Sequence, residues 1–222
     1  MKALLLAAGR GERMRPLTDE RPKPLLTVGR ETLIERHLRK LNEAGVSEVV
    51  INLHYRGDLI QEALGDGQRY GLKITYSIEP DLLETGGGAK QALGYLGEAP
   101  FIIASSDILV DFDYRHLFDV DAMSNHLVLV RNPEHHPQGD FRLTASGFAR
   151  LGDEVTFAGI GVITPGLVRN CPKTVFPLRD VLFRAASEGI LTGEMHLGYW
   201  SDVGTPERLA AARADYHSGL CR

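Results

Sequence analysis

Residues 1–26 constrain the fold more than any other stretch of the sequence. The apolar run Ala3–Leu6 leads into a turn of small residues that contains Gly9 and Gly11, and the segment continues with Pro16, Pro22 and Pro24. A short apolar run that ends at glycines is typical of a buried strand. Because proline cannot occupy a helix interior, no regular helix directly follows the turn. The segment therefore predicts a strand, then a turn with an accessible backbone, then an irregular stretch.

This turn has the composition of a polyphosphate site. Glycine lets backbone N–H groups approach a ligand closely, and Arg13 and Lys23 add positive charge, with Arg10 and Arg15 as weaker candidates. The dinucleotide-binding fingerprint is excluded because its third glycine would fall at Met14, and the Gly-Lys-Ser/Thr of ATPase-type loops is absent. On composition alone, a strand with a solvated basic loop remains the alternative.

The rest of the chain alternates helical and strand patterns. Apolar periodicity predicts helices at 32–44, 58–64, 86–96, 178–186 and 206–216, and strands at 48–53, 73–78, 100–104, 126–130, 141–143, 155–163, 191–197 and 199–200. Such alternation predicts an α/β fold, Rossmann-like, with a mixed, mainly parallel central sheet flanked by helices. Ligands of such sheets gather at the carboxyl ends of the strands, here at 7–11, 52–54, 79–88 and 105–107.

One carboxylate stands at such a strand end. Asp107 follows the apolar strand at 100–104 and two serines. Mg²⁺ prefers oxygen ligands and is usually held by one or two carboxylates together with substrate phosphates. From its position alone, Asp107 is equally well explained as a turn residue that caps the next segment.

Composition limits the partners. The net charge of -4 over 222 residues argues against general nucleic-acid binding. Two cysteines give no disulfide framework, and the apolar start is too short for a signal peptide. No apolar run has the ~18 residues that a membrane span needs. We expect a cytoplasmic protein with no nucleic-acid or membrane partner, forming a single domain over 1–222, either a monomer or a small homo-oligomer.

The opening segment resembles the signature of the sugar-phosphate nucleotidyltransferases. The family pattern L-A-A-G-x-G-[TE]-R-[LM]-x-P-L-T followed by P-K-P-L is matched by Leu6-Ala7-Ala8-Gly9-Arg10-Gly11-Glu12-Arg13-Met14-Arg15-Pro16-Leu17-Thr18 and by Pro22-Lys23-Pro24-Leu25. A second match, to W-x-D-[IV]-G-T-P, runs from Trp200 to Pro206. Members of this family join a nucleoside triphosphate to a sugar 1-phosphate, release pyrophosphate and use Mg²⁺.

The resemblance assigns roles to individual residues. It implies that Arg13, Lys23 and Asp107 are catalytic and that Asp107 and Asp202 hold Mg²⁺. For Asp202, a helix-entry turn is the structural alternative. Nucleotide binding is implied for Leu6, Ala7, Ala8, Gly9, Gly11, Arg13 and Lys23. The family has Asn-Gly-Asp or Gly-Asp at the first metal position, whereas this chain has Ser-Ser-Asp, so the contact that precedes Asp107 differs.

Two further regions resemble the base and sugar sites of the family. The stretch from Glu79 to Gly88 is similar to the base-reading loop, in which Glu79, Glu84, Gly86 and Gly87 would contact a pyrimidine. Residues 1–113 would then form the nucleotide-binding half, and 114–222 the sugar-binding half. Gly139, Asp140 and Thr156 are the candidate sugar contacts, although the family's Glu-Lys-Pro is missing there. The adjacent His135 and His136 predict a surface turn rather than a metal site.

The resemblance implies UTP as the donor and a sugar 1-phosphate as the acceptor. Within the family, Leu-Glu-Thr-Gly-Gly-Gly, Asn-Pro-Glu-His-His-Pro-Gln-Gly-Asp-Phe-Arg-Leu and Thr-Phe-Ala-Gly-Ile are most similar to short uridylyltransferases of peptidoglycan recycling, whose acceptor is N-acetylmuramic acid 1-phosphate. The alternatives are guanylyl transfer to mannose 1-phosphate and thymidylyl or uridylyl transfer to glucose 1-phosphate. A non-catalytic sensor that binds a nucleotide sugar is the alternative from another class.

Overall fold

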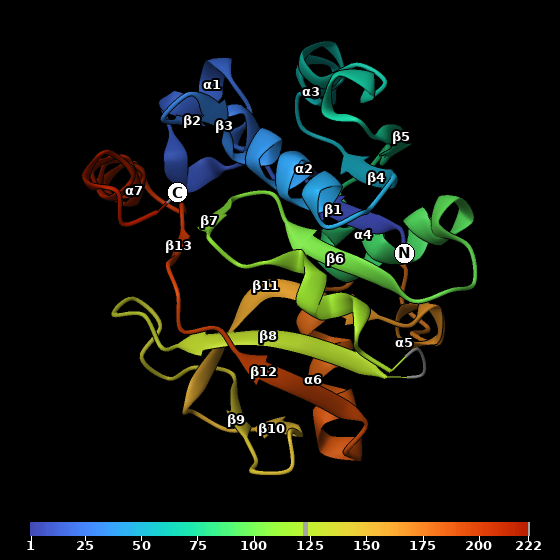
Figure 1. The fold of residues 1–222 in the computed structure, drawn as a ribbon. Coiled ribbons are helices and arrows are strands. Elements are labelled where there is room, and N and C mark those ends of the chain that lie inside the picture. The colour runs from blue at the N-terminus through green and yellow to red at the C-terminus, as the bar shows by residue number, and fades with distance from the viewer. Residues whose placement is uncertain (122–123, 222) are drawn as a thin grey trace.

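The fold is built on four parallel strands. The computed structural model describes residues 1–121 and 124–221. Within them β6 (Phe101–Ser105), β1 (Ala3–Leu6), β4 (Glu48–Leu53) and β5 (Lys73–Ile78) lie side by side in that order (Figure 1). Leu5 of β1 pairs with Ile51 on one side and Ala104 on the other. β6, β1 and β4 are buried and mostly apolar on both faces because helices cover both, which is the pattern expected of a buried parallel sheet, whereas the edge strand β5 is partly exposed.

The second half of the chain extends this sheet with antiparallel strands. β11 (Val155–Ile163) runs antiparallel to β6, and β8 (Asn125–Arg131) runs antiparallel to β11. β12 (Leu191–Met195) is parallel to β8, while the short strands β9 (Phe141–Leu143) and β10 (Ala149–Leu151) follow at the edge of β11. In the described part of the chain, nine strands form this one sheet, which confirms the mixed α/β class expected from the sequence.

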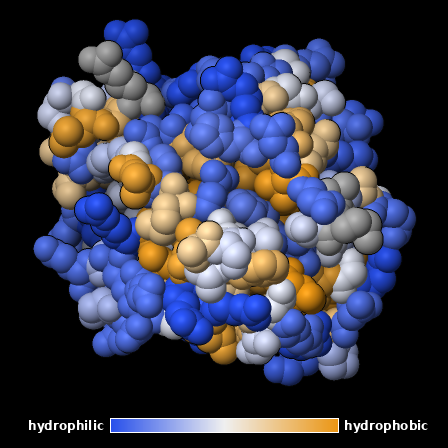
Figure 2. All heavy atoms as spheres, turned by 60° about the horizontal axis from the view of Figure 1, so that its bottom comes forward, coloured by the Kyte–Doolittle hydropathy of each residue, from blue (hydrophilic) through white to orange (hydrophobic). Residues whose placement is uncertain are grey.

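Helices on the two faces of the sheet enclose two separate cores. α2 (Leu33–Glu43) and α3 (Gly57–Leu64) cover one face, and α4 (Glu84–Leu96), α5 (Pro165–Arg169) and α6 (Leu178–Glu188) cover the other (Figure 1). Thr32 and Glu35 form a reciprocal capping box that fixes where α2 begins. Polar and charged side chains cover most of the face drawn in Figure 2, and apolar ones lie among them in small groups. None of the described helices combines the length and apolar character required to cross a membrane.

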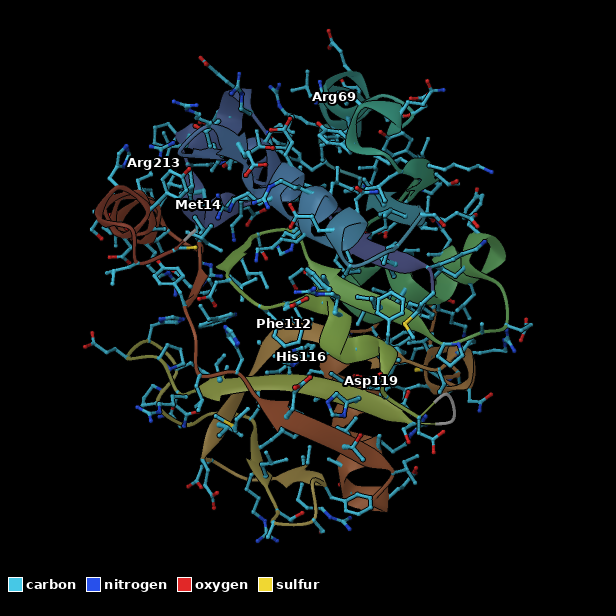
Figure 3. The ribbon with its side chains drawn as sticks, viewed as in Figure 1. Met14, Arg69, Phe112, His116, Asp119 and Arg213 are labelled. Carbon is cyan, nitrogen blue, oxygen red and sulfur yellow. The ribbon has the colours of Figure 1, made fainter. Side chains whose placement is uncertain are left out.

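A third, smaller core joins the two ends of the chain. It contains Met14 of the opening segment, Val28, Val203 just before α7 (Pro206–Ser218) and Leu209 of α7. Figure 3 shows Met14 beside α7. The third core also packs around the short strands β2 (Thr27–Val28) and β3 (Glu31–Thr32). The opening turn is therefore held against the segment that follows Asp202, which the sequence places almost 200 residues later.

The structure differs from the sequence-based elements mainly in its short pieces. β7 (Ile108–Val110) and β13 (Trp200–Asp202) pair with each other, and neither β7 nor β10 was expected. Helices α1 (Leu17–Glu20) and α5 were also missed, α4 begins two residues earlier than predicted, and β12 ends at Met195 rather than at 197. Short strands depend on distant partners for their hydrogen bonds, so local periodicity carries little information about them.

Candidate active site

A cavity of about 520 Å³ lies where the opening turn meets the carboxyl ends of β1 and β6. We call it the turn cavity. Its lining comprises Leu6, Ala7, Ala8, Gly9, Arg10, Gly11, Glu12, Arg13, Met14, Lys23, Pro24, Asn52, Leu82, Glu84, Thr85, Ser105, Ser106, Asp107 and Gly204. The opening-segment residues predicted to bind nucleotide therefore come together with Asp107, as the rule for parallel strands predicts. The strand-end rule places Asn52, Thr85, Ser105 and Ser106 near a ligand without giving them individual roles, whereas Gly204 was not expected there.

Buried hydrogen bonds fix the position of the opening turn. Asn52 accepts a hydrogen bond from the Ala7 N–H at 2.8 Å and donates to Glu79 at 2.6 Å. The Ser106 hydroxyl donates to the Leu6 carbonyl at 2.6 Å, so it ties the end of β6 to the end of β1. Ser106, the second of the two serines before Asp107, thus has a structural function in this chain. A polar residue inside the apolar pattern of β4 was the signal that could have identified Asn52.

Gly11 is required by the backbone of the turn. Its φ of 62° lies in the left-handed region, and a Cβ there would lie 3.0 Å from the Thr18 methyl group. Thr18 also donates to the Gly11 carbonyl at 2.9 Å. Side chains rarely adopt this conformation, whereas glycine does so at little cost. The turn therefore keeps a fixed shape with no side chain between its backbone and a ligand.

Lys23 and Asp107 form the central charge pair of the turn cavity. The Lys23 ammonium lies 2.6 Å from Oδ2 of Asp107, and the Lys23 side chain is only 10% exposed. Removal from water would raise the pKa of the Asp107 carboxyl, but the charge and hydrogen bond of Lys23 outweigh this effect and hold that pKa below its usual value. Asp107 is therefore an ionised carboxylate at neutral pH, and it lines the cavity.

Arg13 is a cation of the turn cavity that is available to bind a ligand. Its exposed side chain forms no ion pair with any residue in 1–121 or 124–221, and it lines the cavity. Arg10 instead lies 3.8 Å from Glu12, and Arg15 lies 3.2 Å from Asp19. An unpaired guanidinium at a glycine turn can bind a phosphate through two parallel hydrogen bonds. This arrangement agrees with the ranking of Arg13 above its two neighbours.

Asp202 lies close to Asp107 because β13 pairs with β7, but the Asp202 side chain lines a different cavity. Asp202 pairs with Ile108 across β13 and β7, and the Val203 N–H donates to the Asp107 carbonyl at 3.1 Å. The Asp202 side chain lines a second cavity of about 620 Å³, which we call the Arg208 cavity. There Oδ1 of Asp202 lies 2.9 Å from Arg208 and 3.1 Å from His135.

The two aspartates fit a magnesium ion as oxygen donors. Oδ1 of Asp202 is buried yet makes no hydrogen bond with the described residues, so its demand for a partner is incompletely met. Two carboxylates at adjacent strand ends, beside a cavity that can hold phosphates, form a donor set of the kind that Mg²⁺ prefers. The described part of the chain contains no group of three or more His, Cys, Asp or Glu side chains arranged for a metal ion. Any Mg²⁺ held here would need substrate oxygens to complete its coordination.

The predicted base-reading loop is helical from Glu84 onward, two residues before the start expected for the helix at 86–96. Residues 84–88 belong to α4, and the N–H groups of Gly86 and Gly87 donate to the Phe176 carbonyl at 2.9 and 3.1 Å. These donors are therefore not available to a base, and neither glycine lines the turn cavity. A Cβ on Gly86 would overlap the Phe176 ring. Close packing of α4, rather than space for a planar ligand, explains the glycines.

The two glutamates of the same stretch have different surroundings. Glu79 is 2% exposed, and its carboxylate accepts hydrogen bonds from Asn52 and from the Leu83 N–H at 3.1 Å. Glu79 is therefore a support for the turn and not part of the cavity lining. Glu84 does line the turn cavity, and it begins α4 with a φ of 63°, a conformation rare for residues other than glycine.

The candidate sugar residues lie beside the Arg208 cavity rather than in its lining. Asp140 accepts a hydrogen bond from the Phe157 N–H at 3.0 Å and contacts His136, and Thr156 donates to Asn132 at 2.9 Å. Gly139 has a φ of 56° and packs against Asn132. These three residues shape the segment between β8 and β11, and no sugar contact follows from their placement. His135 lies in a turn, as predicted from the sequence.

Comparison with known proteins agrees with this geometry. The sequence profile described as "Nucleotidyl transferase" matches residues 2–143. The chain is 45% identical to N-acetylmuramate alpha-1-phosphate uridylyltransferase of Neisseria meningitidis, over 96% of this chain and 97% of that protein. It is 30% identical to mannose-1-phosphate guanyltransferase of Aspergillus oryzae, over 100% of this chain but 64% of that protein.

A solved structure also shares the fold. A putative glucose-1-phosphate thymidylyltransferase from Bacillus anthracis, crystallised with sucrose, superposes with a TM-score of 0.86 at 21% identity, over 96% of this chain and 94% of that one. The sequence profile, the relatives over nearly the whole chain and the shared fold lead to one conclusion. The chain belongs to the nucleotidyl transferase family.

Proposed function

We propose that this chain transfers UMP from UTP to N-acetylmuramic acid 1-phosphate, giving UDP-N-acetylmuramic acid and pyrophosphate. The observation that carries the proposal is the turn cavity, where an accessible glycine backbone, unpaired Arg13 and the Lys23–Asp107 pair meet. The choice of UTP and of this acceptor rests on the 45% identity to the Neisseria enzyme. The first half of the chain would hold the nucleotide and the second half the acceptor.

The proposed reaction needs positioned charge rather than a proton acceptor. An oxygen of the sugar phosphate attacks the α-phosphorus of UTP, a new phosphoanhydride bond forms, and the bond to the pyrophosphate oxygen breaks. The attacking oxygen is already anionic near neutral pH, so no general base is required. Stabilisation of the charge on the transferred group is then the main task of the site.

This chain's residues have distinct tasks in that reaction. The backbone of the glycine turn approaches the triphosphate, and Arg13 binds its outer oxygens through a planar fork. Lys23 keeps Asp107 ionised and brings positive charge close to the reacting phosphate. Asp107 and Asp202 would hold Mg²⁺, which supplies further positive charge to the phosphate oxygens when it is bound.

Pyrophosphate release from the purified chain tests the proposal. UTP with Mg²⁺ would be offered together with N-acetylmuramic acid 1-phosphate, glucose 1-phosphate or mannose 1-phosphate, and GTP and dTTP would replace UTP in parallel. We expect release with UTP and the muramic acceptor and little with the other pairs. Turnover confined to GTP and mannose 1-phosphate would refute the uridylyl assignment, and no release with any pair would favour the non-catalytic sensor. Cytoplasmic location and oligomeric state stay predictions.

A further inference from the structure

Arg208 occupies the boundary between the two cavities. It lies in the first turn of α7, where its N–H donates to Thr205, and its side chain is 19% exposed. The guanidinium group extends toward β13 and passes over Gly204, where a Cβ would overlap its terminal nitrogen. Gly204 lines the turn cavity, whereas Arg208 lines the second one. The guanidinium is therefore within reach of both.

The hydrogen-bonding capacity of this guanidinium is largely unused. One terminal nitrogen lies 2.9 Å from Oδ1 of Asp202, but that oxygen makes no hydrogen bond, so the contact is one of charge alone. The buried Nε of Arg208 also has no hydrogen-bond partner among the described residues. A buried donor without a partner costs free energy, and a planar guanidinium can satisfy several donors on one anion. The Arg208 guanidinium therefore has donors that can still bind an anion.

The neighbouring charges leave room for an anion. Of the other groups that line the Arg208 cavity, Asp215 accepts a hydrogen bond from Tyr199 at 2.8 Å, and His196 lies 2.8 Å from Asp111. Asp202 itself carries the charge that Arg208 faces. Its second oxygen lies 3.3 Å from a Cβ built on Gly204, a residue that lines the turn cavity. If a cation bound in the turn cavity shares the charge of Asp202, the guanidinium retains a positive charge for a second anion.

We infer that Arg208 binds an anionic group of the acceptor sugar phosphate. This inference rests on the proposed function, because it takes UTP to fill the turn cavity and the acceptor to enter from the Arg208 cavity. The two cavities meet at residues 202–204, next to Asp107, which is where the acceptor phosphate has to arrive. The anion is the 1-phosphate that every acceptor carries or the carboxylate of the muramic lactyl group.

Steady-state kinetics of Arg208→Gln test the inference. Loss of a charge-assisted hydrogen bond costs about 1.5–3 kcal/mol, which corresponds to roughly a 10- to 100-fold change in affinity. We expect the KM for the acceptor to rise by about that factor, while the KM for UTP stays within about twofold. Arg208→Lys should recover part of the loss, since it keeps the charge without the planar fork. Arg213→Gln is the matched control on the same helix (Figure 3), because the Arg213 guanidinium donates to the Thr27 carbonyl and lines neither cavity.

A second variant displaces the guanidinium without removing it. In Gly204→Ala the new methyl group meets the flexible end of Arg208, so the side chain moves while the backbone stays. This variant should raise the acceptor KM as well, and its melting temperature should remain close to that of the wild type. An unchanged acceptor KM in Arg208→Gln, with a lower kcat and a greater Mg²⁺ requirement, would show that Arg208 only positions Asp202 and would overturn the inference.

Two acceptors distinguish the source of the anion. N-acetylglucosamine 1-phosphate lacks the lactyl carboxylate of the muramic acceptor but shares its 1-phosphate. A KM increase with both acceptors identifies the 1-phosphate as the group bound by Arg208, and an increase confined to the muramic acceptor identifies the carboxylate. If the wild type uses neither with UTP, the proposed function fails, and the same variants are compared with whichever sugar 1-phosphate and triphosphate are turned over. If the acceptor KM measured with those substrates is unchanged in the Arg208 variants, the inference about Arg208 is contradicted independently of the proposed function.

Discussion

The Lys23 ammonium lies 2.6 Å from Oδ2 of Asp107, and this contact connects the opening segment to the end of β6. The two residues are 84 positions apart in the sequence. Lys23 follows a proline and begins a short 3₁₀ helix (Lys23–Leu25). Asp107 follows Ser106, whose hydroxyl donates a hydrogen bond to the end of β1. The contact places a cation and a carboxylate side by side in the wall of the turn cavity.

Lys23→Gln should lower kcat/KM by about 100-fold or more, because removal of one positioned donor to a developing charge typically costs that much. The pKa of Asp107 should rise in this variant, since Lys23 is the group that lowers it. Pyrophosphate-release kinetics measure the first effect. Arg15→Gln is the control, because Arg15 lies outside the lining of the turn cavity and forms an exposed ion pair with Asp19 at 3.2 Å. A similar loss in that variant would contradict a special role for Lys23.

Asp107→Asn and Asp202→Asn should each abolish turnover while leaving nucleotide binding in the absence of metal. Replacing a carboxylate by an amide removes the charge that a divalent cation requires but keeps the shape of the side chain. Equilibrium binding of UTP with and without Mg²⁺ measures this separation. Excess chelator should inactivate the wild type, and added Mg²⁺ should restore it. Full activity of Asp107→Asn would exclude this carboxylate as a metal ligand.

Gly88→Ala and Gly94→Ala should change stability in opposite directions, although both lie in α4. A Cβ on Gly88 would overlap the buried carboxylate of Glu79, and the repacking should cost about 1–3 kcal/mol. Gly94 is exposed with nothing within 4 Å of an added Cβ, so alanine there should stabilise the protein by about 0.5–1 kcal/mol. Urea unfolding of both variants measures the difference. Equal effects of the two substitutions on stability would refute the close packing proposed for the glycine-rich start of α4.

Stability should fall as the pH is lowered from about 6.5 toward 4, through His37. Burial lowers the pKa of this side chain to about 4, against the opposing effect of its hydrogen bond to the Ile108 carbonyl at 3.1 Å. The unfolded chain takes up a proton on His37 near pH 6.5, whereas the folded chain does not. The contribution of His37 to the free energy of unfolding is therefore complete above that pH and is lost as the pH falls below it. The loss should approach about 3 kcal/mol by pH 4.

Comparison with a non-titrating variant isolates the contribution of His37. The pH-dependent fall over this window should be smaller in His37→Gln than in the wild type when both are followed by denaturant unfolding. Tyr114→Phe is the second test, because Tyr114 lies 2.7 Å from the other ring nitrogen of His37. Leaving that nitrogen without a partner should cost about 1–3 kcal/mol at neutral pH. A pH profile unchanged by His37→Gln would contradict the assignment.

Much of the turn cavity was predictable because its residues are local in sequence. Strand β1, the glycine turn and the two basic residues Arg13 and Lys23 follow one another within the opening segment, and residues so close in the chain have few ways to be arranged. Asp107 was predictable for a different reason. The carboxyl ends of neighbouring parallel strands meet at one edge, so a polar residue after β6 had to lie near the turn.

Packing between distant segments decided what the sequence left open. The helix expected at 86–96 begins at Glu84, and its first N–H groups, on Gly86 and Gly87, donate to the carbonyl of Phe176. Phe176 lies about 90 residues away, and no local pattern contains that partner. Asp202 was identified from its motif, but its contacts with Arg208 and His135 depend on how β13 and α7 pack beside the loop after β8. The sequence by itself determined which residues surround the turn and the strand ends, because chain connectivity and strand direction fix them. Tertiary structure alone decided which donors are already bonded and which remain free for a ligand, because hydrogen bonds and ion pairs form only between groups that folding brings within reach.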